Sequence, residues 1–223
     1  TLARRSPSAV AGAVCSGIVL GAFWALTPIY GKALNLSDID IANFTAAAIF
    51  GGAATQWPIG WLSDHCRDRR EMLMAVAAGS AFSAIALSLL DNILIKAPEP
   101  NDYIAVAFLL GIFIFSIYGM AVAQTHDRFP AHEALEATRG LLLLHGAGAA
   151  IGPIASSLAM QYLGPEGFPY SVAAATFLLL LFVWRRITTD DPVPMEERLP
   201  FHVASDQVSL VGVEMDPRAD APL

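Results

Sequence analysis

Long uncharged stretches alternate with short polar segments along most of the sequence. Six stretches contain no Asp, Glu, Lys or Arg, and each is 17 to 25 residues long. A helix of roughly 20 apolar residues spans the hydrocarbon of a bilayer, so each stretch predicts one transmembrane helix. The six predicted spans are residues 9–31, 41–62, 72–90, 103–125, 140–164 and 168–184.

The pattern inside the six spans favours helices over strands. Strands of a membrane barrel alternate apolar and polar residues over about 10 positions, whereas these spans are apolar on all sides. Inside lipid every backbone group must be hydrogen-bonded within the protein, which a helix achieves by itself. The charged fraction of 15% and the mean hydropathy of +0.54 agree with this interpretation. We therefore predict an all-α, polytopic membrane protein with six transmembrane helices.

The net charge of −7 is concentrated near the carboxyl end. Beyond Ile187 the sequence is rich in acids and prolines and poor in aromatic residues, which is typical of a solvated, disordered segment. We therefore predict two parts, a six-helix transmembrane domain over 1–187 and an acidic, disordered cytoplasmic tail over 188–223. The sequence has no basic stripe of the kind that binds nucleic acid.

The basic residues between the spans are distributed unevenly, and this predicts the orientation in the bilayer. Lys and Arg are enriched on the cytoplasmic side of membrane proteins. With the amino terminus inside, the outer loops hold only Lys32 and Lys96. We therefore expect both termini in the cytoplasm and insertion into the inner membrane of a bacterium. The inner segments hold nine arginines, which are Arg4, Arg5, Arg67, Arg69, Arg70, Arg128, Arg139, Arg185 and Arg186.

The six spans divide into two groups of three, and the middle span of each group is the richest in Gly and Pro. Because each group has an odd number of spans, the second group enters the membrane from the opposite side. The layout therefore predicts two inverted three-helix repeats, which are typical of transporters. Small residues spaced four apart let helices approach closely. We expect such helix packing at Gly17, Gly21, Gly148, Gly152 and the adjoining Pro153.

The loop after the second span places an acid among arginines. Asp64 lies where the second helix should end, next to the negative end of the helix dipole, which is unfavourable for a carboxylate. It should therefore be held by a positive group, either Arg69 or Arg70 or the amino terminus of a neighbouring helix. Such a contact can form in one conformation and break in another. The alternative is that Arg67, Arg69 and Arg70 only fix the topology.

This loop resembles the major facilitator superfamily, which carries G-x-L-x-D-R-x-G-R-R between the second and third helices of each six-helix half. In this sequence His65 replaces the first basic residue and the second glycine is absent. A second stretch, Gly148-x-x-x-Gly152-Pro153, is similar to the core of the family's antiporter motif, without the glycine pair that should follow. The loop residues that match the family are Gly60, Leu62, Asp64, Arg69 and Arg70.

The resemblance implies a secondary transporter that moves a small molecule by alternating access. Because the family has twelve helices in two halves, six spans imply one half, which pairs with a second six-helix partner. The start at Thr1 and the long tail favour the C-terminal half over the N-terminal one. The implied conformational latch consists of Gly60, Asp64, Arg67, Arg69 and Arg70.

The resemblance also implies that substrate binds near mid-membrane, against the first two helices of each group. His145 is the only titratable residue within a span besides Cys and Tyr. We favour a neutral histidine that is hydrogen-bonded to a neighbouring helix, and the alternative is a titrating group with protons as the coupling ion. The polar or aromatic candidates for the substrate cavity are Phe23, Thr27, Tyr30, Thr45, Gln56, Ser116, Gln124 and His145.

Other chemistries find little support in the sequence. His126, Asp127, His132 and Glu133 follow the fourth span, but the histidines would not share a helix face, so a solvated loop is favoured over a metal site. No nucleophile–base pair, phosphate loop or zinc motif is visible. We therefore expect no enzyme activity, metal or cofactor. A non-transporting fragment or assembly subunit of another membrane protein stays open as an alternative function.

Overall fold

The computed structural model describes residues 2–90 and 98–189, and these form helices joined by short loops. The predicted tail over 188–223 lies almost entirely outside the described residues, as does Lys96. The helices, in chain order, are α1 (Leu2–Arg5), α2 (Pro7–Ala33), α3 (Asp38–His65), α4 (Arg69–Leu89), α5 (Pro100–Ile114), α6 (Ser116–His126), α7 (Ala131–Leu163) and α8 (Gly167–Thr189).

The prediction of an all-α, polytopic membrane protein is confirmed. Five helical segments of the described chain are long and apolar enough to cross a membrane, with α5 and α6 counted together as Pro100–His126. The remaining long helix, α3, has 28 residues and reaches the length of a span. Its sequence includes the polar residues Asn43 and Gln56, but residues 41–62 carry no charged residue, which is how the span was predicted.

Local sequence explains where α3 begins. At the start of α3 the Ser37 hydroxyl accepts a hydrogen bond from the Asp40 N–H at 3.2 Å, and the Asp40 carboxylate accepts one from the Ser37 N–H at 3.2 Å. This capping box satisfies backbone donors that a helix start leaves unpaired. The predicted span 103–125 corresponds to one candidate span, Pro100–His126, in which Phe115 alone separates α5 from α6.

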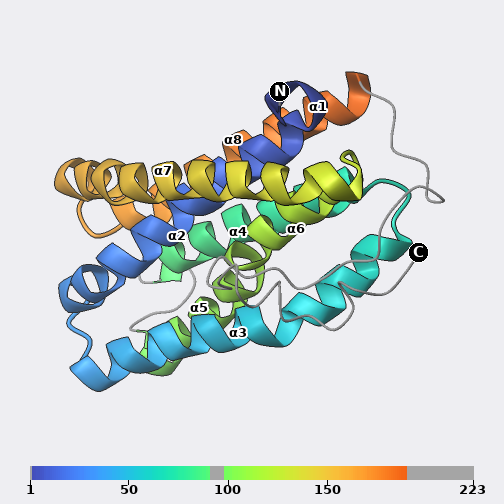
Figure 1. Ribbon diagram of the computed structural model, residues 1–223. Coiled ribbons are helices and arrows are strands. Elements are labelled where there is room, and N and C mark those ends of the chain that lie inside the picture. The colour runs from blue at the N-terminus through green and yellow to red at the C-terminus, as the bar shows by residue number, and fades with distance from the viewer. Residues whose placement is uncertain (1, 91–97, 190–223) are drawn as a thin grey trace.

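The helices pair in a pattern that agrees with the two inverted repeats. α2 packs most extensively against α7, α3 against α5, and α4 against α8. The first helix of one group thus contacts the second helix of the other, in both directions, and the two third helices contact each other. In Figure 1 the helices run side by side, with α8 largely behind α7 and α2.

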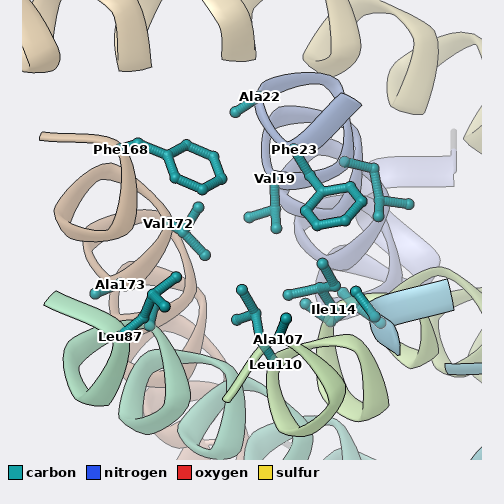
Figure 2. Packing of buried hydrophobic residues seen from close by; sticks show 14 of the residues in the cluster. Val19, Ala22, Phe23, Leu87, Ala107, Leu110, Ile114, Phe168, Val172 and Ala173 are labelled. Carbon is teal, nitrogen blue, oxygen red and sulfur yellow. The ribbon is translucent and has the colours of Figure 1, made fainter. Parts of the chain in front are cut away.

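The buried core lies where α2, α4, α5 and α8 meet (Figure 2). In that view Phe23 and Val19 of α2 face Leu110 and Ile114 of α5, and Val172 belongs to α8. Between helices in lipid the hydrophobic effect supplies little driving force, so shape-matched packing of such side chains holds the bundle together.

Glycines bring α2 and α7 into backbone contact. A Cβ atom added to Gly17 would overlap the carbonyl oxygen of His145, and one added to Gly152 would overlap that of Ile18. Gly21 and Gly148 lie in the same contact, against Ala149 and Val14. The two small-residue motifs of the sequence therefore pack against each other, at a separation that only glycine permits.

Candidate functional site

Three helix ends meet at the end of the bundle that carries Arg69, Arg128 and Arg186, which we call the basic end. α3 ends at His65, α4 begins at Arg69, and α6 ends at His126. Because α3 and α6 both end here, the negative ends of two helix dipoles point at this region. A buried positive charge at this position is therefore favourable.

Arg69 supplies that charge and pairs with the acid singled out in the sequence. Its Nη2 lies 2.5 Å from Oδ1 of Asp64, and the arginine side chain is only 3% exposed. Asp64 sits near the end of α3, so the contact joins α3 to the first residue of α4. Arg69 is therefore a partner of Asp64.

Asp127 is a second partner of Arg69, and the sequence analysis missed it. Its Oδ1 accepts a hydrogen bond from Nη1 of Arg69 at 2.8 Å, and its side chain is 5% exposed. The expectation of a solvated loop is therefore wrong for Asp127. The missed signal is the one that found Asp64, because Asp127 is also a carboxylate at a helix C-terminus, here that of α6.

Two further hydrogen bonds that involve backbone carbonyls fix the position of Arg69. Nη1 also donates to the carbonyl oxygen of Ala123 at 3.3 Å, and the Gln124 amide donates to the Arg69 carbonyl at 3.4 Å. Gln124 was a candidate for the substrate cavity, but the structure places it here, at the basic end. One guanidinium thus joins α3, α4 and α6.

Arg70 has a separate role, since it joins α4 to α8. Its Nε donates to Asp68 at 2.8 Å, and its Nη1 donates to the backbone carbonyl of Arg186 near the end of α8 at 3.1 Å. Asp68 also caps α4 by accepting from the Arg70 N–H at 2.9 Å. Of the other predicted latch residues, Arg67 is exposed and Gly60 is buried one turn before Asp64.

A second group of contacts at the basic end is more exposed. Nη1 of Arg5 lies 2.5 Å from Oε2 of Glu133, with the two side chains 53% and 41% exposed. Nη1 of Arg128 donates to the Arg5 carbonyl at 3.0 Å, and the Arg5 guanidinium lies 5.2 Å from the Phe129 ring centre. Exposed ion pairs of this kind contribute little to stability.

The predicted cavity residues do not gather at one point. Phe23 and Tyr30 are buried in the core, where Tyr30 stacks on Phe168 at 5.2 Å. Gln56 is half-buried on α3, one turn from Gly52. The hydroxyls of Thr27, Thr45 and Ser116 donate to carbonyls four residues earlier in their own helices.

His145 lies inside the α2–α7 contact. It is 7% exposed, and its ring meets the edge of Tyr118 with the ring centres 5.0 Å apart. Its backbone carbonyl is the group that Gly17 accommodates. The histidine is therefore packed against protein, and a role in proton coupling stays a prediction.

Two aromatic residues that pack beside Phe23 were not among the cavity candidates predicted from the sequence. Trp24 and Phe115 form a triangle of rings with Phe23, and Trp24 is 44% exposed. The sequence signal was available for Trp24, since an aromatic residue follows Phe23 directly. No such signal pointed to Phe115, because nothing in the sequence indicates that α5 and α6 are separated there.

Metal binding gains no support from the geometry. Within residues 2–90 and 98–189 no group of three or more His, Cys, Asp or Glu side chains is placed to hold a metal ion. His126 contacts the hydroxyl of Thr138 at 3.1 Å instead. Among the described residues, neither Cys15 nor Cys66 forms a disulfide.

An all-helical membrane bundle with paired three-helix groups and a charged cluster at one end defines a class of transport proteins. Comparison with known proteins gives the family. Residues 9–212 match the Major Facilitator Superfamily, and the chain belongs to that family.

The relatives are described as MFS-type transporters. The sequence is 29% identical over 194 residues to an uncharacterized MFS-type transporter of Enterobacter sp. (strain 638), which covers 86% of this chain and 47% of the relative. It is 27% identical over 191 residues to YcaD of Salmonella typhi, covering 85% of the chain and 47% of the relative. The chain therefore spans about half the length of these relatives.

A solved structure has the same fold. The crystal structure of an auto inhibited POT family peptide transporter superposes with a TM-score of 0.66 at 13% identity, covering 91% of this chain and 39% of the other. Together these findings show an integral, multi-pass membrane protein of a transporter family rather than an enzyme.

Proposed function

We propose that this chain is one six-helix half of a secondary active transporter, which moves a small molecule across the membrane by alternating access. The observation that carries the proposal is the bridge from Arg69 to Asp64 and Asp127. A buried cation held by two carboxylates from two other helices forms only while the three helix ends are together. It therefore stabilises one conformation over another.

The second half is supported by the length of the relatives, of which the chain spans about half. α4 and α8 pack against each other and leave α2, α3, α6 and α7 on the side seen in Figure 1. On this proposal the second half faces that side, with substrate between the two. The C-terminal position of this half, cytoplasmic termini, inner-membrane insertion and proton coupling through His145 stay predictions.

The test uses the product of the complete reading frame that encodes this chain. We would express it as the unaltered protein and as Asp64→Asn, and compare the small-molecule content of the cells with that of cells carrying an empty vector. We expect at least one compound whose level follows the unaltered protein. Its initial transport rate in proteoliposomes should fall in Asp64→Asn at equal membrane content.

Asp38→Asn is the matched control, because Asp38 pairs with Lys32 at the opposite end of the bundle and its side chain is 88% exposed. It removes the same charge without touching the Arg69 bridge and should transport normally. If no compound follows the unaltered protein although it inserts, the alternative of a non-transporting assembly subunit is favoured. If Asp64→Asn transports like Asp38→Asn, the bridge is not a latch.

A further inference from the structure

The three rings of Phe23, Trp24 and Phe115 form an aromatic triangle between α2 and the α5–α6 junction. Their centres lie 5.4, 5.8 and 6.0 Å apart, with each pair edge to face. Phe23 is 1% exposed and anchors the triangle in the core, whereas Trp24 is 44% exposed. The triangle therefore presents one open aromatic edge on a rigid base.

The helix interruption and a glycine hold Phe115 in this position. Phe115 is the single residue between α5 and α6. On α3, a Cβ atom added to Gly52 would lie 2.7 Å from the Cβ of Phe115, which is too close for any side chain. Gly52 thus leaves room for the ring, so three elements, α2, α3 and the α5–α6 junction, converge on it.

Most polar groups near the triangle are already engaged. The hydroxyls of Thr27 and Ser116 donate to Phe23 and Ile112 carbonyls at 2.6 and 2.7 Å. Gln56 differs, since its half-buried amide takes no hydrogen-bond partner from the described part of the chain. It follows Gly52 by four residues, so both lie on the same face of α3, about one helical turn apart.

The absence of charged residues from the spans on α2 and α3 limits the class of substrate further. Between residues 41 and 62 on α3, and between 9 and 31 on α2, the sequence carries no Asp, Glu, Lys or Arg. A charged ligand group taken to membrane depth against this wall would lose its hydration without gaining a counter-ion. The wall instead offers aromatic edges, which favour another ring, and one amide.

We propose that Trp24, Phe115 and Gln56 form this half's substrate-contact surface, and that the substrate is an uncharged, planar aromatic molecule with a hydrogen-bonding group about one helical turn from its ring. The assignment rests on the proposed transport function, because it takes the exposed edge of Trp24 to face the second half rather than lipid. The assignment goes beyond the transport proposal by naming the chemical class of the substrate and the residues that select it.

The test measures binding to the 223-residue chain in lipid nanodiscs and requires no transport. The probe is 4-bromobenzamide, an uncharged ring with an amide, whose bromine quenches indole fluorescence on contact. The reporter variant keeps Trp24 alone, with Trp57, Trp61 and Trp184 changed to Phe. A second variant keeps only Trp184, which lies on α8 and reports partition into the bilayer.

We expect quenching of Trp24 to saturate with probe concentration, while quenching of Trp184 rises linearly. The charged isostere 4-bromobenzoate should bind at least about tenfold more weakly. Gln56→Leu should weaken the benzamide about 2- to 10-fold, as loss of one neutral hydrogen bond does. Phe115→Ala should weaken it by a similar factor, as loss of one ring pair does.

Phe108→Ala is the matched control for Phe115→Ala. The ring of Phe108 on α5 lies 6.4 Å from that of Phe50 on α3. It contributes one ring pair outside the triangle, whereas Phe115 contributes two, with Phe23 and Trp24. Removal of the Phe108 ring should leave binding unchanged. Phe115→Tyr keeps the ring and should bind normally, which separates a lost contact from a misfolded chain.

Equal, linear quenching of Trp24 and Trp184 would overturn the proposal, and so would benzoate binding as tightly as benzamide. Equal losses from Phe108→Ala and Phe115→Ala would show a general packing effect and also overturn it. These results are distinct from a failure of the transport proposal. Saturable binding with no transported compound would retain the surface and reject transport, whereas transport without saturable quenching would place the substrate elsewhere.

Discussion

Removing either carboxylate of the Arg69 bridge should open the basic end, and by different amounts. The side chains of Arg69 and Asp127 are 3% and 5% exposed, whereas that of Asp64 is 29% exposed. Breaking a buried pair costs about 3–5 kcal/mol, while a partly exposed one contributes about 1 kcal/mol or less. We therefore expect Asp127→Asn to weaken the closed state by about 3 kcal/mol and Asp64→Asn by about 1 kcal/mol.

The native thiol Cys66 reports this opening. It is half-buried at the end of α3, between Asp64 and Arg69, while Cys15 is buried in the core and serves as the internal control. At 1.4 kcal/mol per tenfold change, the open fraction should rise more than 100-fold in Asp127→Asn and about 5-fold in Asp64→Asn. The assay is the rate of maleimide addition to Cys66 in nanodiscs, followed by mass spectrometry.

The double variant tests whether the two contacts belong to one network. With both carboxylates neutral, Arg69 is left buried without a counter-charge, so the combined effect should exceed the sum of the single effects. Glu136→Gln removes an exposed acid on α7 and should change nothing. The reasoning fails if Asp127→Asn labels no faster than Glu136→Gln, or if Asp64→Asn exceeds Asp127→Asn.

Two further predictions concern packing and surface charge. Gly148→Ala should lower the free energy of unfolding by about 1–3 kcal/mol, since its Cβ would overlap the Val14 carbonyl. The control Gly146→Ala meets nothing within 4 Å and should stabilise the protein slightly. Titration with denaturing detergent measures both, and equal effects would contradict the close contact. Glu133→Gln breaks the exposed pair with Arg5 and should change the same quantity by less than about 1 kcal/mol, so a larger loss would show that the pair is buried in a state other than this one.

The six spans were predictable because lipid imposes a constraint on sequence that soluble proteins escape. Each span must be apolar along its whole length, so length alone located both ends of α2 and α4 to within three residues. By contrast, α7 begins nine residues earlier and α8 ends five residues later than predicted. Asp64 was found for a similar reason, since a carboxylate at a helix C-terminus needs a cation. Which arginine supplies it depends on the path of the loop, and only the structure selects Arg69.

The break between α5 and α6 at Phe115 and the pairing of the glycine motifs were not predictable in the same way. Residues 111–119 contain no proline or charged residue that would mark a break, and the close contact of Phe115 is with Gly52, which is distant in sequence. The small-residue motifs at Gly17 and Gly148 each predict a close helix–helix contact. The spacing of the glycines does not indicate which helices are in contact. The partner of a helix is a property of the whole bundle and becomes visible only when all six spans are placed.

Phe115 separates two parts of one span, α5 and α6, that are held in place by different kinds of contact. On one side, α5 is in backbone contact with α3, where Gly111 leaves no room for a Cβ against the Ala48 carbonyl. On the other side, α6 ends at the Arg69–Asp127 contact, which is an ion pair and can separate. Opening the basic end should therefore move α6 relative to α5, with Phe115 at the pivot.

Because the ring of Phe115 also contacts that of Trp24, this motion should change the environment of Trp24 in the aromatic triangle. In the variant that keeps Trp24 as its only tryptophan, Asp127→Asn should shift the Trp24 emission maximum and change 4-bromobenzamide affinity several-fold. Glu136→Gln should do neither. If Asp127→Asn accelerates Cys66 labelling while Trp24 emission and affinity stay constant, the span moves as one rigid helix, and the bridge and the triangle are independent.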